Sequence, residues 1–130
     1  MSHKMKNRPA IFIDMKKSRI RIHKCTLELL GNPSYIQLLV NPSAQTIAIK
    51  RTTGSDYLSH KIHDKCCELY SRNFLRALRS ASSGWNEQEA YRIYGTLIES
   101  CQLIQFSMED SIRVNNLHKG VPTNVQNDDS

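Results

Sequence analysis

Short runs of alternating or β-branched residues recur along the chain and predict β-strands. In the clearest run, residues 19–23, Ile20 and Ile22 face one way and the intervening cationic side chains face the other. Further strands are predicted at residues 10–14, 35–40, 46–50, 90–99 and 102–108. Turn-forming residues at 41–45 and a tight connection at 100–101 join the last four strands in pairs, which predicts two β-hairpins.

Two segments have the spacing of helices. Apolar side chains at three- and four-residue steps predict one long amphipathic helix over residues 60–81, with the apolar face spread over 62–81. A second, short helix is predicted over residues 26–30, with Thr26 as a possible N-cap and Gly31 as the stop. Separate helices and hairpins together indicate an α+β fold.

The order of these elements divides the chain into four parts. They are residues 1–9, a basic arm; residues 10–51, a β-rich unit; residues 60–112, a helix with a β-hairpin; and residues 113–130, a flexible tail without periodicity. The stretches 27–50 and 74–108 each contain a helix followed by a hairpin. They are either divergent copies of one unit or two common motifs.

Composition narrows the class of protein. The 130 residues are 39% hydrophobic and 23% charged, which is typical of a globular protein with an ordinary core. No apolar run is long enough to span a bilayer, and the N-terminus lacks the apolar stretch of a secretory signal. A cytoplasmic location is therefore expected, with no membrane partner.

The positive charge of the chain is concentrated near its start. The whole sequence carries +6, whereas its first 25 residues hold eight Lys and Arg against a single acid, a local +7. Five cations fall within nine residues: Lys16, Lys17, Arg19, Arg21 and Lys24. On a strand, Arg19 and Arg21 project from the same face about 7 Å apart, close to the spacing of successive phosphates. With no acid adjacent, these cations exceed what protects a strand edge and predict a site for nucleic acid.

The same segment resembles a known motif. The residues SRIRIH at 18–23, a gap of six residues and then Leu30-Gly31 resemble the opening of AbrB/SpoVT-type regulators. Those proteins have Gly-Arg-aliphatic-x-Ile-Pro, a similar gap and Leu-Gly at the end of a short helix, followed by a hairpin. The resemblance covers residues 10–51, and Arg19 matches the arginine of the family.

This resemblance implies a small swapped-hairpin β-barrel, a homodimer of interleaved hairpins, and DNA binding by the basic side chains of the first strands. Two departures concern the DNA contacts. His23 stands where the family has proline, and Leu27 and Glu28 stand where family members often place arginines that contact DNA. Residues 60–108 have no counterpart in the family, and form either an extra domain or a second barrel half that lets one chain imitate the dimer.

Two functions follow as alternatives. The first is a small transcriptional regulator that binds duplex DNA through the five cations, with duplex preferred because Phe12 is the one aromatic residue near them. The second is a protein-interaction module, antitoxin-like or an accessory factor of a mobile element, whose basic segment meets an acidic protein partner.

Catalytic and metal-binding chemistry has weaker signals. On a helix, one stripe would hold His60, His63 and Cys67 (or Cys66), with Cys25 and His23 as outside ligands. The paired ligand spacing of zinc modules is absent, and Cys66 falls on the apolar face, so free thiols are the simpler interpretation of the cysteines. Phosphate-binding glycine loops and an oriented nucleophile are also absent. We therefore expect neither an enzyme nor a cofactor.

Overall fold

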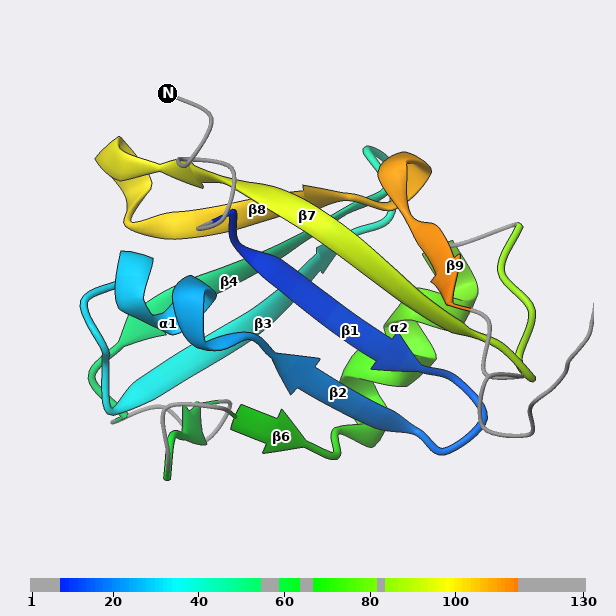
Figure 1. Cartoon of the computed structure of the whole chain (residues 1–130), viewed down its shortest axis with the longest axis horizontal. Helices are drawn as coiled ribbons and strands as arrows, with labels where there is room; N and C mark the ends of the chain where they lie inside the picture. Colours follow the sequence, from blue (N-terminus) through cyan, green and yellow to red (C-terminus); the bar gives the residue numbers. More distant parts are fainter. Residues whose placement is uncertain (1–7, 55–58, 64–66, 82–83, 115–130) are drawn as a thin grey trace, which may run out of the picture.

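Nine β-strands and two helices make up the described part of the chain in a computed structural model, which covers residues 8–54, 59–63, 67–81 and 84–114 (Figure 1). The strands are β1 (Ala10–Asp14), β2 (Arg19–Ile22), β3 (Tyr35–Asn41), β4 (Thr46–Thr52), β5 (His60–Lys61), β6 (Cys67–Leu69), β7 (Ala90–Ile98), β8 (Leu103–Ser107) and β9 (Ile112–Val114). The helices are α1 (Lys24–Leu29) and α2 (Arg72–Ala81), with 3₁₀ turns at Glu99–Cys101 and Met108–Asp110. Neither helix in these ranges is long and apolar enough to cross a membrane.

All nine strands belong to one antiparallel sheet, in which eight follow the order β5-β3-β4-β8-β7-β1-β2-β6 and β9 pairs with β7. The long strand β7 pairs with β1 on one side and with β8 and then β9 on the other. The sheet curls into a half-barrel, so that β7, β1 and β2 lie side by side at the front of Figure 1 with α2 behind them.

The core fills the inside of this curled sheet. Alternation along β1 and β2 brings Ile11 opposite Ile22 and Ile13 opposite Ile20, and all four side chains are fully buried. Of the inward positions predicted from the sequence, Ile20, Ile22, Leu30, Ile36, Ile47 and Ile49 are buried and Leu38 is partly buried. The helix α2 adds Phe74, Leu75 and Leu78 to the core.

The first helix starts earlier than predicted. Its N-cap is His23, without a side-chain cap, so the prediction of Thr26 as N-cap is wrong. Thr26 is fully buried inside α1, where its hydroxyl accepts the N–H of Ala10 at 2.8 Å and donates to the carbonyl of Ala10 at 2.9 Å. Thr26 therefore joins α1 to the start of β1. Gly31, with φ +83°, follows the last turn and confirms the predicted stop.

The long helix predicted over residues 60–81 is wrong in its first part. Only Arg72–Ala81 is helical, whereas His60–Lys61 and Cys67–Leu69 are strands, and residues 64–66 lie outside the described ranges. The strands β5 and β6 pair with the outer edges of β3 and β2, where backbone groups would otherwise lack partners. Pairing at these edges overrides a helical spacing of apolar residues. Ser71 begins α2, because its hydroxyl accepts the N–H of Phe74 at 3.3 Å.

The two predicted hairpins are confirmed, and the predicted tail begins later than expected. The strands β3 and β4 pair along their whole length, and β7 and β8 pair from Gly95–Phe106 to Ile98–Leu103.

Arg113 and Val114 belong to β9, so the expectation of a tail from residue 113 is wrong for these two residues. Residues 1–7 and 115–130, most of the predicted arm and tail, lie outside the described part.

Strands from the two halves of the sequence are interleaved in the sheet, mostly two at a time. The order β-β-α-β-β occurs twice, first as β1, β2, α1, β3, β4 and then as β5, β6, α2, β7, β8. In this comparison β1 corresponds to β5, β2 to β6, β3 to β7 and β4 to β8. The β1–β7 pair then corresponds to the β5–β3 pair, and the β2–β6 and β4–β8 pairs each join two corresponding strands. The two halves therefore share the order of their elements and interlock with each other, although the β1–β2 pair has no counterpart between β5 and β6 in the described residues.

Candidate nucleic-acid interface

The outer face of β2 carries two of the predicted cations. Because Ile20 and Ile22 face the core, Arg19 and Arg21 point outward, as the alternation predicts. The Arg21 side chain is 48% exposed and that of Arg19 only 26%. The two arginines therefore differ in how well they can reach a ligand.

Contacts with acidic side chains explain why Arg19 is less exposed than Arg21. Arg19 Nη2 lies 3.5 Å from Asp14 Oδ2, and Arg19 Nη1 lies 3.6 Å from Glu68 Oε2. Arg21 Nη2 also contacts Glu68 Oε2, at 3.0 Å. The sequence argument that no acid neighbours these cations is therefore wrong, because β6 brings Glu68 alongside β2. Arg19 lies between two carboxylates, whereas Arg21 shares one that is itself 36% exposed.

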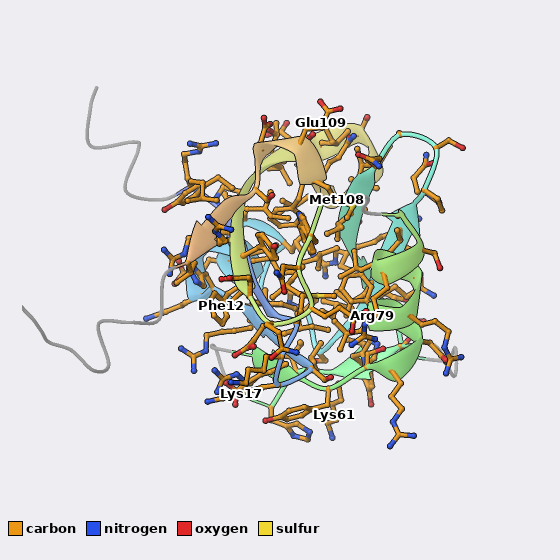
Figure 2. The ribbon with its side chains drawn as sticks, turned by 90° about the vertical axis from the view of Figure 1, so that its right-hand side faces the viewer. Phe12, Lys17, Lys61, Arg79, Met108 and Glu109 are labelled. Carbon is orange, nitrogen blue, oxygen red and sulfur yellow. The ribbon has the colours of Figure 1, made fainter. Side chains whose placement is uncertain are left out.

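The predicted lysines lie at the two ends of β2. Lys16 and Lys17 are exposed in the turn from β1 to β2, where Asp14 Oδ1 accepts the N–H of Lys17 at 3.0 Å. Lys24 is exposed at the start of α1, beyond the other end of the strand. Figure 2 shows Phe12 and Lys17 on one side of the molecule and Arg79, on α2, on the other. Lys17 therefore lies on the side of the molecule that carries Phe12, away from α2.

A third arginine, missed at the level of sequence, joins this face. In the sheet register Arg21 lies opposite Phe12, and Phe12 lies opposite Arg92 on β7. Directly opposite residues share a face, so a row Arg21–Phe12–Arg92 crosses three strands. Within the described ranges Arg92 has no ion pair, and its Nε is buried without a hydrogen-bond partner. Alternation in residues 90–98 marks Arg92 as outward, but only the β1–β7 pairing shows its neighbours.

The pKa of His23 reflects the positive charge of this face. It is half-buried, and burial lowers its pKa below the ordinary value of 6.5, with further lowering by the charges of Arg92 and Arg21. Both guanidinium groups therefore act at His23, although the two arginines are 71 residues apart in sequence. A positive potential that repels a proton attracts an anion at the same place.

Acidification should destabilise the protein through two histidines. Burial also lowers the pKa of His60, so both His23 and His60 favour the neutral form in the folded state. Stability is complete above the unfolded-state pKa of 6.5 and is lost as the pH falls from there toward the lower folded-state pKa values. We expect a lower urea midpoint at about pH 5.5 than at about pH 7.5. Replacing both histidines by glutamine should reduce that difference, and an unchanged difference would assign it to other groups.

The proposed metal ligands are not brought together as a helical stripe. His60 lies in β5, His63 follows it, and Cys67 lies in β6, so the helix on which the stripe depended does not exist there. In the part of the chain that the structure describes, no three His, Cys, Asp or Glu residues could hold a metal ion. Cys25, a proposed outside ligand, donates its thiol to the carbonyl of Arg8 at 2.9 Å.

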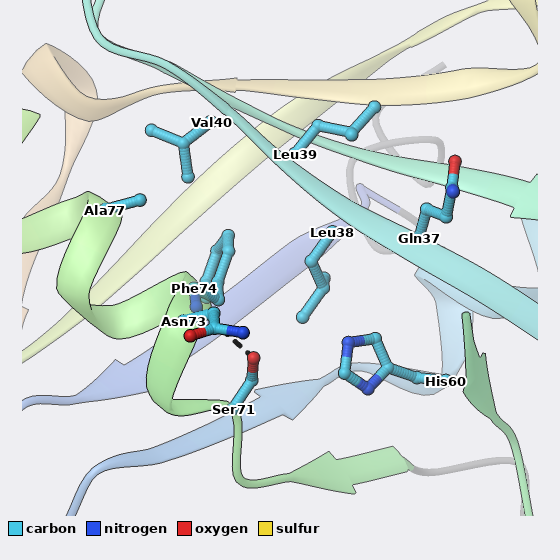
Figure 3. Close-up of a pocket in the computed structure, with 9 residues that line it drawn as sticks. All are labelled: Gln37, Leu38, Leu39, Val40, His60, Ser71, Asn73, Phe74 and Ala77. Carbon is cyan, nitrogen blue, oxygen red and sulfur yellow. Dashed lines mark hydrogen bonds between the residues drawn. The ribbon is translucent and has the colours of Figure 1, made fainter. Parts of the chain in front are cut away.

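His60 instead faces a pocket of about 340 Å³ between β3 and α2 (Figure 3). Its lining is mainly apolar and includes Leu38, Phe74 and Ala77. The Ser71 hydroxyl at its rim is engaged in capping α2, and no described lining residue carries a carboxylate. The pocket offers a neutral imidazole on an apolar wall.

Comparison of the chain with models of protein families, with curated proteins and with solved structures gives no match.

Proposed function

We propose that this chain binds DNA through the outer face of β2, β1 and β7. The observation that carries the proposal is the convergence of Arg21 and Arg92 from distant strands beside His23, whose pKa both charges lower. Arg92 forms no ion pair in the described part of the chain, so no carboxylate neutralises its charge and a phosphate oxygen would do so. Phosphate is the anion that a basic protein surface meets at regular spacing along DNA.

The cations of this face have different roles. Lys16, Lys17 and Lys24 are exposed and contact phosphates on either side of the arginine row. Arg21 exchanges its exposed partner Glu68 for phosphate at little cost, because an exposed ion pair contributes little. Arg19 is a positioning residue that orients Asp14 and Glu68.

The topology supports a transcriptional regulator of the swapped-hairpin type. In such a barrel, hairpins of two equivalent halves interleave, which is the relation that the β1–β7, β5–β3, β2–β6 and β4–β8 pairs have in this sheet. The two halves of this chain would then take the places of two subunits. This favours a second barrel half, within one chain, over an extra domain.

The chain should accordingly be a monomer in solution, whereas an obligate homodimer is what the resemblance alone implies. With both halves present, β1 and β4 already have partners on both sides. Sedimentation at micromolar concentration should give a single species near 14.9 kDa. A species of twice that mass that persists on dilution would contradict the single-chain arrangement.

DNA binding of the intact chain should depend steeply on salt. If Arg21, Arg92 and the three lysines each engage one phosphate, the log–log slope for a duplex should be about −4.5. Affinity should then fall about 500-fold between 50 and 200 mM salt, measured by fluorescence anisotropy with a labelled duplex of about 20 base pairs. Binding without salt dependence, or no binding, would overturn the proposal and leave the protein-interaction module with an acidic partner.

A further inference from the structure

Aromatic side chains lie among the arginines of the proposed interface. Phe12 sits between Arg21 and Arg92 in the cross-strand row. Tyr94 lies opposite Ala10, two residues along each strand from that row, so it is diagonal to Phe12 on the same face. The Arg8 guanidinium lies over the Tyr94 ring, 4.7 Å from its centroid. We call Arg8, Phe12, Arg21, Arg92 and Tyr94 the aromatic–arginine face.

This face is accessible. Phe12 and Tyr94 are both partly exposed, although they lie on two central strands of the sheet. Figure 2 places Phe12 and Arg79, which belongs to α2, on opposite sides of the molecule, so α2 does not cover Phe12. Two partly exposed rings therefore lie on central strands with cations around them, and the Arg8 guanidinium over Tyr94 shows that this ring can hold a flat cationic or aromatic group against its face.

We infer that the aromatic–arginine face binds single-stranded DNA in preference to duplex, with bases stacked on Phe12 and Tyr94 and phosphates on Arg21 and Arg92. In a duplex, both faces of each base are covered by neighbouring bases, and only phosphates and groove edges are available. In a single strand, the bases are free to stack on aromatic rings that lie between cations. The inference rests on the proposed DNA binding and specifies the form of DNA.

The sequence favoured duplex DNA because Phe12 was the one aromatic residue near the basic segment. The β1–β7 pairing removes that argument, since it brings Tyr94 and Arg92 from the second half of the chain next to Phe12. Both forms of DNA share the phosphate contacts, so duplex still binds through charge. The stacked bases add affinity that duplex cannot provide.

The test compares labelled oligothymidylate of about 20 nucleotides with a duplex of the same length at one salt concentration. The intact chain should bind the single strand about 100-fold more tightly than duplex, because each of two stacked bases contributes about tenfold. Phe12→Ala and Tyr94→Ala should each weaken single-strand binding about tenfold and change duplex binding less than about twofold. Arg21→Ala should weaken both.

Controls separate stacking from damage to the fold. Leu39→Ala removes an exposed apolar side chain on β3 and should change neither affinity. Phe12→Trp keeps an aromatic face and should retain single-strand binding. If Phe12→Ala does not fold, Phe12→Leu keeps apolar bulk without an aromatic face and should show the same selective loss.

Two results overturn the inference in different ways. If duplex binds as tightly as the single strand while Arg21→Ala weakens both, the inference is wrong and the proposed DNA binding stands. If neither form shows salt-sensitive binding, both are wrong.

Discussion

Replacing Arg21 and Arg92 together by alanine should lower the affinity for duplex DNA about 60-fold at 0.1 M salt and reduce the salt slope by nearly two units. Each phosphate contact contributes a slope of about −0.9, so loss of one contact at this salt concentration weakens binding about eightfold. The two arginines lie in one cross-strand row on either side of Phe12, so one stretch of DNA backbone can reach both. Anisotropy titrations of the double variant over a salt series measure both quantities.

A matched variant shows whether position or total charge matters. Arg72 and Arg76 are exposed on α2, and within the described ranges neither forms an ion pair. Replacing both by alanine removes the same net charge from another part of the surface, and should change affinity less than about threefold, because exposed charges beyond a Debye length are screened. Equal losses in the two double variants would mean that net charge, and not the outer face of the sheet, governs binding.

Replacing Thr26 by valine should lower the free energy of unfolding by about 2–4 kcal/mol. Valine has the shape of threonine, so the packing of α1 against β1 is retained. The buried N–H of Ala10 loses its acceptor, and the carbonyl of Ala10 loses the hydroxyl donor. A buried donor without a partner costs its full desolvation free energy, which exceeds the net contribution of an ordinary hydrogen bond.

Urea denaturation of Thr26→Ser provides the control. Serine keeps the hydroxyl and loses one buried methyl group, so its unfolding free energy should fall by only about 1 kcal/mol. Both variants should unfold with the same m-value as the parent, since the surface exposed on unfolding is unchanged. If serine is as destabilising as valine, packing of the methyl group, rather than the hydroxyl, accounts for the role of Thr26.

Patterns within a single element were read correctly from the sequence. Alternation predicted β2 and the outward direction of Arg19 and Arg21, and turn residues predicted both hairpins. These features depend on interactions between residues that are close in sequence, so the local order of apolar, polar and turn-forming residues is enough to predict them. The short helix before Gly31 was also predicted from its local pattern, but its N-cap was not.

Features that depend on the topology were not predicted. His60–Lys61 and Cys67–Leu69 fall within a helical spacing of apolar residues but form β5 and β6, because they pair with the edges of β3 and β2. The same pairing places Glu68 against Arg21, and the β1–β7 pairing places Arg92 and Tyr94 beside Phe12. No local pattern contains these neighbours, so the part of the candidate interface that β7 provides is visible only in the folded sheet.

The pairing of β1 with β7 also constrains how the chain can fold during its synthesis. Ala10 pairs with Tyr94 and Asp14 with Ala90, so β1 lacks this partner until most of the chain has left the ribosome. The β3–β4 hairpin is local and can form early, whereas β4 then waits for β8. Contacts of such long sequence separation slow folding, because the intervening loop must close before the contact forms. Until then the nascent chain exposes open strand edges to other chains, and its folding is completed only after β7 and β8 have emerged.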